Sequence, residues 1–135
     1  MIDISTTIAA SLDKVWSKWI SVEDVQYWSF ASDDWGAEGI ENEVEVGGTF
    51  KARNFAKDGT MEFILGWTYD QVEPKKFLAY TMGDGRKVHV TFSETEEGIR
   101  IDQSFEPESE NSEELQRDGW QAYLDNFKKF VEASA

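Results

Sequence analysis

The sequence predicts an α+β domain in which one long helix lies over one antiparallel sheet. Residues 111–132 carry apolar side chains three, four and seven positions apart, which places a broad apolar stripe on one side of a helix. Residues 44–105 instead form short runs in which apolar and polar residues alternate, as is typical of strands. The predicted helix stripe consists of Leu115, Trp120, Tyr123, Leu124, Phe127, Phe130 and Val131.

A first strand and two short helices are expected before this sheet. Residues 2–9 alternate in the manner of a strand, and Ser11 stands where a helix N-cap is expected. Ser21 and Asp24 have the spacing of a capping box, which predicts a second helix. The segment 32–42 has two glycines, several acidic residues and no periodicity, so it is interpreted as a loop at the edge of the domain.

The sheet itself is predicted from alternation and turn residues. Val44 and Val46 alternate with glutamates, and Gly47-Gly48 suggests a bend before the next strand. Four further short turns separate the later strands, so we expect a meander of antiparallel neighbours. Their sequences are Asp58-Gly59, Pro74-Lys75-Lys76, Gly83-Asp84-Gly85 and Glu96-Glu97-Gly98. The final helix is expected to begin with Asn111 as its cap and Glu114 three residues later.

The composition of the chain limits the classes of partner and the kinds of site that are expected. The 135 residues suit a single domain, expected to span 1–135. Thirteen basic residues against 27 acidic ones give a formal charge of −14, which disfavours nucleic acids and anionic membranes as partners. The chain has no cysteine and one histidine, so no metal site is expected. No signal peptide or run of about 18 apolar residues is visible, and a cytoplasmic protein is the simplest reading.

A set of short segments along the chain, together with the order of elements, matches a known family. The matching residues are 10–16, Trp28, 46–50, Gly66, 72–74, 77–81 and 119–124. The order of elements resembles the helix-grip plan of the START-like (SRPBCC) superfamily, in which a curved antiparallel sheet wraps around a long C-terminal helix. Within it, these residues resemble the single-domain bacterial homologues of the activator of heat-shock-protein-90 ATPase. Two departures are Ile99, where the family often has Thr, and Phe105, where many members carry a polar residue.

The resemblance implies a cavity between sheet and helix that can hold an apolar ligand. Strand parity directs one set of side chains toward it, Val44, Val46 and Met61 among them, and Gly119 is expected to let helix and sheet approach closely. Tyr80 and Gln103 are the expected polar contacts. The alternative is a filled core in which both merely bond to neighbours. The candidate ligand-binding residues are Trp35, Phe50, Phe63, Trp67, Tyr80, Val90, Gln103, Phe105, Trp120, Tyr123 and Phe127.

The sequence therefore predicts a small-molecule-binding module without a cofactor. A stress-response or chaperone-associated interaction protein is one alternative, with a chaperone or other protein as partner. A polyketide-cyclase-like enzyme is another. The enzyme hypothesis has no candidate catalytic residue, because parity places His89, Glu62 and Asp102 on the outer face of the sheet.

Overall fold

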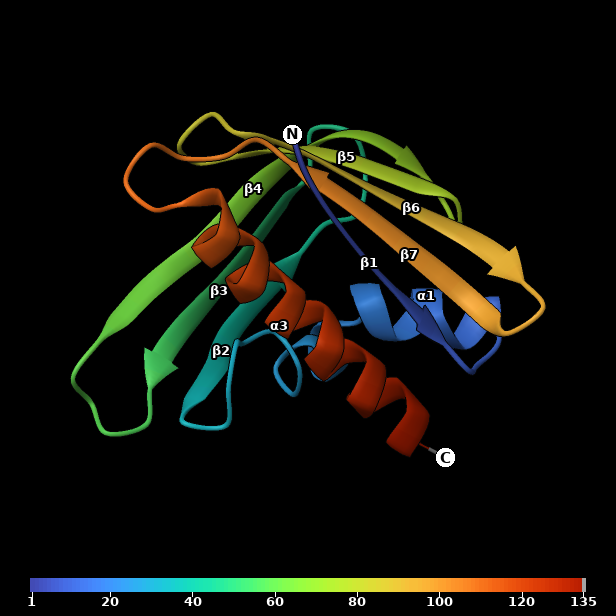
Figure 1. Cartoon of the computed structure of the whole chain (residues 1–135), viewed down its shortest axis with the longest axis horizontal. Coiled ribbons are helices and arrows are strands. Elements are labelled where there is room, and N and C mark those ends of the chain that lie inside the picture. Colours follow the sequence, from blue (N-terminus) through green and yellow to red (C-terminus); the bar gives the residue numbers. More distant parts are fainter. Residues whose placement is uncertain (135) are drawn as a thin grey trace.

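One seven-stranded antiparallel sheet curls around the C-terminal helix (Figure 1). The computed structural model describes residues 1–134. The strands are β1 (Ile2–Ile8), β2 (Trp35–Asn42), β3 (Thr49–Ala56), β4 (Glu62–Glu73), β5 (Phe77–Met82), β6 (Lys87–Thr95) and β7 (Gly98–Phe105). The helices are α1 (Leu12–Ile20), α2 (Val22–Val25) and α3 (Glu113–Ala133).

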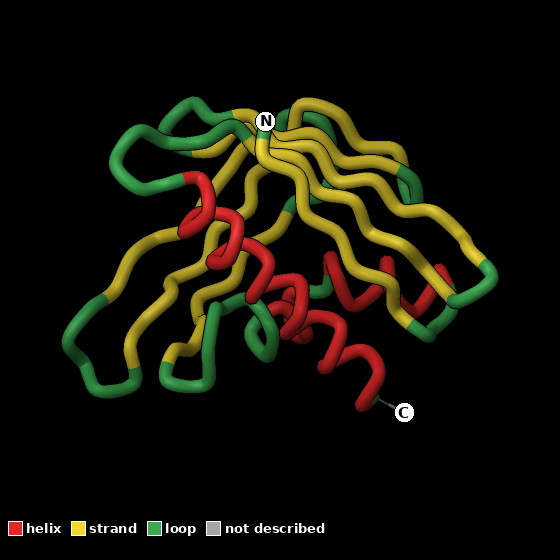
Figure 2. Tube along the Cα trace, viewed as in Figure 1, coloured by secondary structure: helices red, strands yellow, loops and turns green. Residues whose placement is uncertain are grey.

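The strands from β2 to β7 are consecutive neighbours, and β1 pairs with β7 at the other edge of the meander. In that pair Ile2 lies opposite Phe105 and Ile8 opposite Ile99. Figure 2 shows the sheet bent into two halves, with α3 crossing its concave side. The predicted α+β helix-grip fold, with two short helices after the first strand, is confirmed.

The interpretation of residues 32–42 as a loop was wrong, because most of this segment is strand β2. Its glycines hide the strand pattern. Gly36 lies opposite Phe55 of β3, and a Cβ added at Gly36 would come within 2.7 Å of the Phe55 ring. The ring thus covers the position that the glycine leaves without a side chain. Gly39 has φ +61° and lies where the β2–β3 register shifts, so it forms part of a bulge.

The expectation that Val44 and Val46 belong to a strand was also wrong. They lie in the connection between β2 and β3, where the Gly48 N–H donates to the Glu45 carbonyl, and Val46 is 69% exposed. Gly48 is required there, since an added Cβ would come within 2.1 Å of the Glu43 carbonyl oxygen. Met61, which was also expected to face inward, precedes β4 and is 64% exposed at the β3–β4 hairpin.

Helix α3 begins one residue later than expected, with Ser112 as its N-cap rather than Asn111. The Ser112 Oγ accepts a hydrogen bond from the Leu115 N–H at 3.1 Å. At α2 the Ser21 side chain makes no capping bond, and Asp24 instead pairs with Lys18 at 3.8 Å. A four-residue helix held by its neighbours does not need the capping box that its sequence suggests.

We expect the substitution Ser112→Ala to lower the free energy of unfolding by about 1 kcal/mol, because the Leu115 N–H loses its acceptor. The control is Asn111→Ala. Asn111 takes part in hydrogen bonds through its backbone N–H, to Glu108, and its carbonyl, from Gln116. Removing its side chain should change stability by less than about 0.5 kcal/mol. Urea denaturation of both variants measures the difference, and equal effects would contradict Ser112 as the cap.

The main core lies under the C-terminal part of α3, where the helix packs against β1 and α1. Phe127 and Val131 are fully buried there, and Leu124 is almost fully buried. Trp19 of α1 meets the Phe127 ring edge-on at 5.0 Å between centroids. The helix therefore contacts one half of the curved sheet closely and leaves space toward the other half.

Candidate functional site

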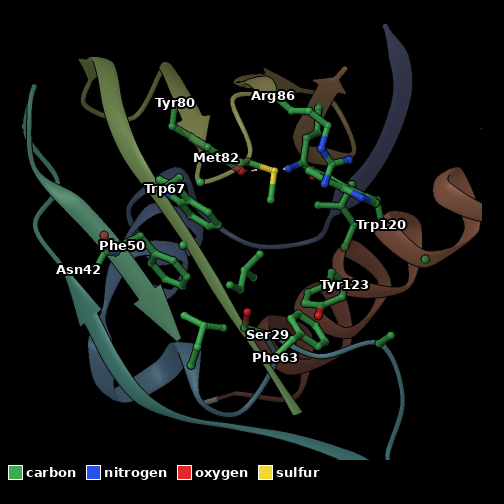
Figure 3. A pocket seen from close by; sticks show the side chains of 18 of the residues that line it. Ser29, Asn42, Phe50, Phe63, Trp67, Tyr80, Met82, Arg86, Trp120 and Tyr123 are labelled. Carbon is green, nitrogen blue, oxygen red and sulfur yellow. Dashed lines mark hydrogen bonds between the residues drawn. The ribbon is translucent and has the colours of Figure 1, made fainter. Parts of the chain in front are cut away.

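A pocket of about 820 Å³ occupies the space between the N-terminal part of α3 and strands β3 to β5. Figure 3 shows it from close by, with Phe50 and Trp67 on one side and Trp120 and Tyr123 on the other. Apolar and aromatic side chains form most of its walls. Phe63, at 45% exposure, packs beside Trp35 at 5.7 Å between ring centroids.

The walls are fixed by ring stacking. Trp67 lies between Phe50 and Tyr80, with near-parallel rings and centroid distances of 4.0 and 4.1 Å. On the opposite wall Trp120 stacks on Phe105 at 3.8 Å and an interplanar angle of 8°. Each ring limits the rotation of the next, so these aromatic surfaces are in place before any ligand arrives.

The polar groups of the pocket bond mostly to one another. Gln103 Nε2 donates to the Tyr80 hydroxyl at 3.3 Å, and the Tyr69 hydroxyl donates to Asn42 Oδ1 at 2.7 Å. The Tyr123 hydroxyl donates to Asn54 Oδ1 at 2.5 Å, which links α3 to β3. These bonds hold the tyrosines in fixed orientations along an otherwise apolar surface.

Burial raises the pKa of all three tyrosine hydroxyls above the ordinary value of a phenol. It raises the pKa of the Tyr69 hydroxyl to about 12 and that of Tyr123 to about 12. The pKa of Tyr80 is raised further, chiefly by its complete burial. A phenol with so high a pKa donates hydrogen bonds but does not act as a base near pH 7.

Two buried donors find no acceptor among residues 1–134, Trp67 Nε1 and Asn54 Nδ2. An unsatisfied buried donor costs about 1–3 kcal/mol. Asn54 still holds Tyr123 through its oxygen, and Trp67 is held by its two stacked neighbours.

A family model described as Activator of Hsp90 ATPase homolog 1-like protein matches residues 9–132. The chain belongs to this family. None of the curated proteins compared with the chain matches it.

Solved structures support the assignment. The solution structure of an AHSA1-like protein from Aeromonas hydrophila is 36% identical, with a TM-score of 0.92 over 98% of this chain and 92% of that one. A protein from Cytophaga hutchinsonii is 41% identical, with a TM-score of 0.83 over 97% of this chain and 91% of that one. A crystal structure from Chromobacterium violaceum, at 18% identity, has the same fold, with a TM-score of 0.86 over 98% of both chains.

In this family member, eight of the eleven candidate ligand-binding residues line the pocket. They are Trp35, Phe50, Phe63, Trp67, Tyr80, Gln103, Trp120 and Tyr123. The other three, Val90, Phe105 and Phe127, are fully buried and do not line it. The reason is the position of α3, which covers the β1 side of the sheet, and Phe105 supports the pocket from behind Trp120.

Other residues that line the pocket were not predicted from the sequence. Tyr69 shares strand parity with Trp67 and could have been found on that ground. Asn42 was hidden because β2 was taken for a loop, and Arg86 because it stands in the β5–β6 turn. Nothing in the local pattern marks Ser29, which is 3% exposed and lies in the segment between α2 and β2.

The expected role of Gly119 was wrong. An added Cβ at Gly119 would meet no heavy atom within 4 Å, so the glycine does not mark a close contact between helix and sheet. Gly119 instead lines the pocket. The missing side chain leaves pocket volume beside Trp120.

His89, Asp102 and Glu62 each lie against a neighbouring side chain. His89 is exposed and lies against Phe77 at 5.6 Å between rings. Asp102 pairs with Arg100, and Glu62 pairs with Arg53. Within residues 1–134 there is no group of three or more His, Cys, Asp and Glu residues that could hold a metal ion. Among the described helices, none combines the length and apolar character needed to cross a membrane.

Proposed function

We propose that this protein is a binding module for an apolar or amphipathic small molecule, held between α3 and strands β3 to β5. The observation that carries the proposal is a pocket of about 820 Å³ whose walls are stacked aromatic rings. This volume falls within the range of about 300–1,000 Å³ typical of small-molecule sites. An aromatic or polycyclic body would lie between the Phe50–Trp67–Tyr80 stack, whose middle ring has both faces covered, and the Trp120 ring.

The polar groups of the pocket suit orientation of a ligand rather than reaction with it. The Tyr80, Tyr69 and Tyr123 hydroxyls remain protonated and already donate or accept bonds within the wall. Their oxygens and the Ser29 side chain offer a few polar contacts on an apolar surface, which is the usual composition of a binding pocket.

The test uses pyrenebutanol, a fluorescent probe with a flat apolar body and a neutral head. We expect saturable binding to the wild type in a fluorescence titration and a rise in melting temperature with probe concentration. Phe63→Ala removes a ring at the pocket and should weaken binding about fivefold. Phe77→Ala is the matched control, because Phe77 lies against His89 outside the pocket.

Native mass spectrometry of protein purified from cells gives an independent readout, with a retained apolar molecule as the expected result. Absence of probe binding together with absence of any retained molecule would overturn the proposal. Equal loss of affinity in the Phe63 and Phe77 variants would place the probe elsewhere on the protein.

The description of the matching family supports a second candidate function, action on the ATPase of an Hsp90 chaperone. The formal charge of −14 favours a basic partner surface. The ATPase rate of a purified Hsp90 with and without this protein tests it. An unchanged rate at saturating protein would exclude this candidate and leave the binding module unaffected.

A further inference from the structure

We infer that the pocket selects ligands carrying an anionic head group, a carboxylate in the simplest case, which pairs with Arg86. This inference rests on the proposed function and names the chemistry of its ligand. Of the described residues that line the pocket, only Asp84 and Arg86 are charged, and both lie in the β5–β6 turn. Figure 3 shows Arg86 at one end of the pocket, beside Met82 and Trp120.

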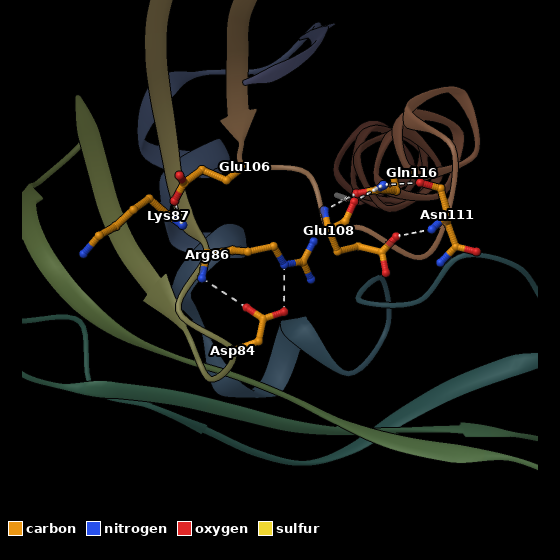
Figure 4. A network of polar contacts seen from close by, with 7 residues as sticks. All are labelled: Asp84, Arg86, Lys87, Glu106, Glu108, Asn111 and Gln116. Atoms are coloured by element: carbon orange, nitrogen blue, oxygen red, sulfur yellow. Dashed lines mark hydrogen bonds and ion pairs between the residues drawn. The ribbon is translucent and has the colours of Figure 1, made fainter.

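The guanidinium of Arg86 is held in place but retains free donors. Asp84 Oδ2 accepts from Arg86 Nε at 2.7 Å, and Asp84 Oδ1 accepts from the Arg86 backbone N–H at 3.1 Å (Figure 4). Within residues 1–134, neither Nη1 nor Nη2 donates a hydrogen bond to the protein. A guanidinium fixed through Nε presents its outer pair of nitrogens, and such a pair binds a carboxylate well.

The surroundings of Arg86 strengthen a charge pair. Its side chain is only 21% exposed, and its guanidinium carbon lies 5.9 Å from the centroid of the Trp120 ring. An ion pair that apolar walls shield from water is stronger than one on an open surface. An apolar body between the rings would bring its head group to this cation.

The carboxylates of Glu106 and Glu108 bond to backbone N–H groups rather than to the Arg86 side chain. Glu106 Oε1 accepts from the Lys87 backbone N–H at 2.6 Å, and Glu108 Oε1 accepts from the Asn111 N–H at 2.7 Å (Figure 4). Gln116 then fixes the same loop through the Glu108 and Asn111 carbonyls. These bonds tie the loop before α3 to the start of β6, which directly follows Arg86, and to the helix that carries Trp120.

The test compares pyrenebutyric acid with pyrenebutanol, which share the apolar body and differ in head-group charge at pH 7. We expect the acid to bind the wild type about tenfold more tightly than the alcohol. The substitution Arg86→Gln should reduce this ratio to about one. The substitution Asp84→Asn removes the negative charge and keeps one acceptor oxygen in the turn, and it should raise the ratio about threefold.

Arg100→Gln is the matched control. Arg100 also pairs with an aspartate two residues away, Asp102, but lies outside the pocket, so the ratio should stay at its wild-type value. Equal affinities of the wild type for acid and alcohol, or a ratio unchanged in Arg86→Gln, would overturn the inference while leaving the binding module standing. Failure of both probes to bind, together with the absence of a retained molecule in native mass spectrometry, would instead overturn the proposed function itself.

Discussion

Replacing Phe127 by alanine is expected to lower the free energy of unfolding by about 3–5 kcal/mol. The ring is fully buried under α3 and meets Trp19 and Trp28 at 5.0 and 4.7 Å between centroids. Truncation removes these contacts and leaves a cavity that the helix cannot collapse into, since it rests on β1 and α1. Urea denaturation followed by tryptophan fluorescence measures the loss.

If the alanine variant does not fold, the smaller change Phe127→Leu can be measured instead. It is expected to lower the free energy of unfolding by about 1–2 kcal/mol. Phe63→Ala is the control, since Phe63 is 45% exposed and should cost about 1 kcal/mol or less. Similar losses from Phe127→Ala and Phe63→Ala would contradict the division of the concave face into a packed half and an open half.

A large side chain at position 119 should close the pocket. We expect Gly119→Phe to weaken binding of pyrenebutanol by at least about tenfold, because Gly119 lines the pocket and a new side chain would meet open space there. Fluorescence titration of wild type and variant gives the change. Circular dichroism and the melting temperature establish that the variant is folded.

Gly119→Ala is the matched control, since it adds one methyl group and leaves most of the volume. It should raise the free energy of unfolding by about 0.5–1 kcal/mol, because glycine is less favourable than alanine in a helix interior and no atom obstructs the Cβ. A folded Gly119→Phe variant that binds the probe as tightly as the wild type would show that the probe lies elsewhere.

The parts of the fold that follow regular patterns could be predicted from the sequence. Strand β5 runs from Phe77 to Met82, as the alternation and the flanking turns predicted. Strand β2 could not be found, because Gly36 and Gly39 removed the side chains that would have revealed it. The residue that completes this strand is Phe55 of β3, whose ring covers Gly36 across the pair.

The sequence could predict which side chains face the concave side of the sheet, but not which of them line the pocket. Parity identified Phe50, Trp67 and Tyr80, since a strand directs alternate side chains to one side. Strand parity does not show which part of that face the helix covers. Phe127 and Tyr123, both on the helix, were therefore both predicted to contact the ligand. The tilt of α3 across a bent sheet separates them.

The pairing of β1 with β7 has a consequence for how the chain folds. Strand β1 has no pairing partner until β7 is present, because Ile2 lies opposite Phe105, and α3 comes later still in the sequence. Closing so long a stretch of chain costs entropy that only the completed sheet repays, which makes for slow folding. During synthesis we therefore expect β1 to remain unpaired until β7 has left the ribosome.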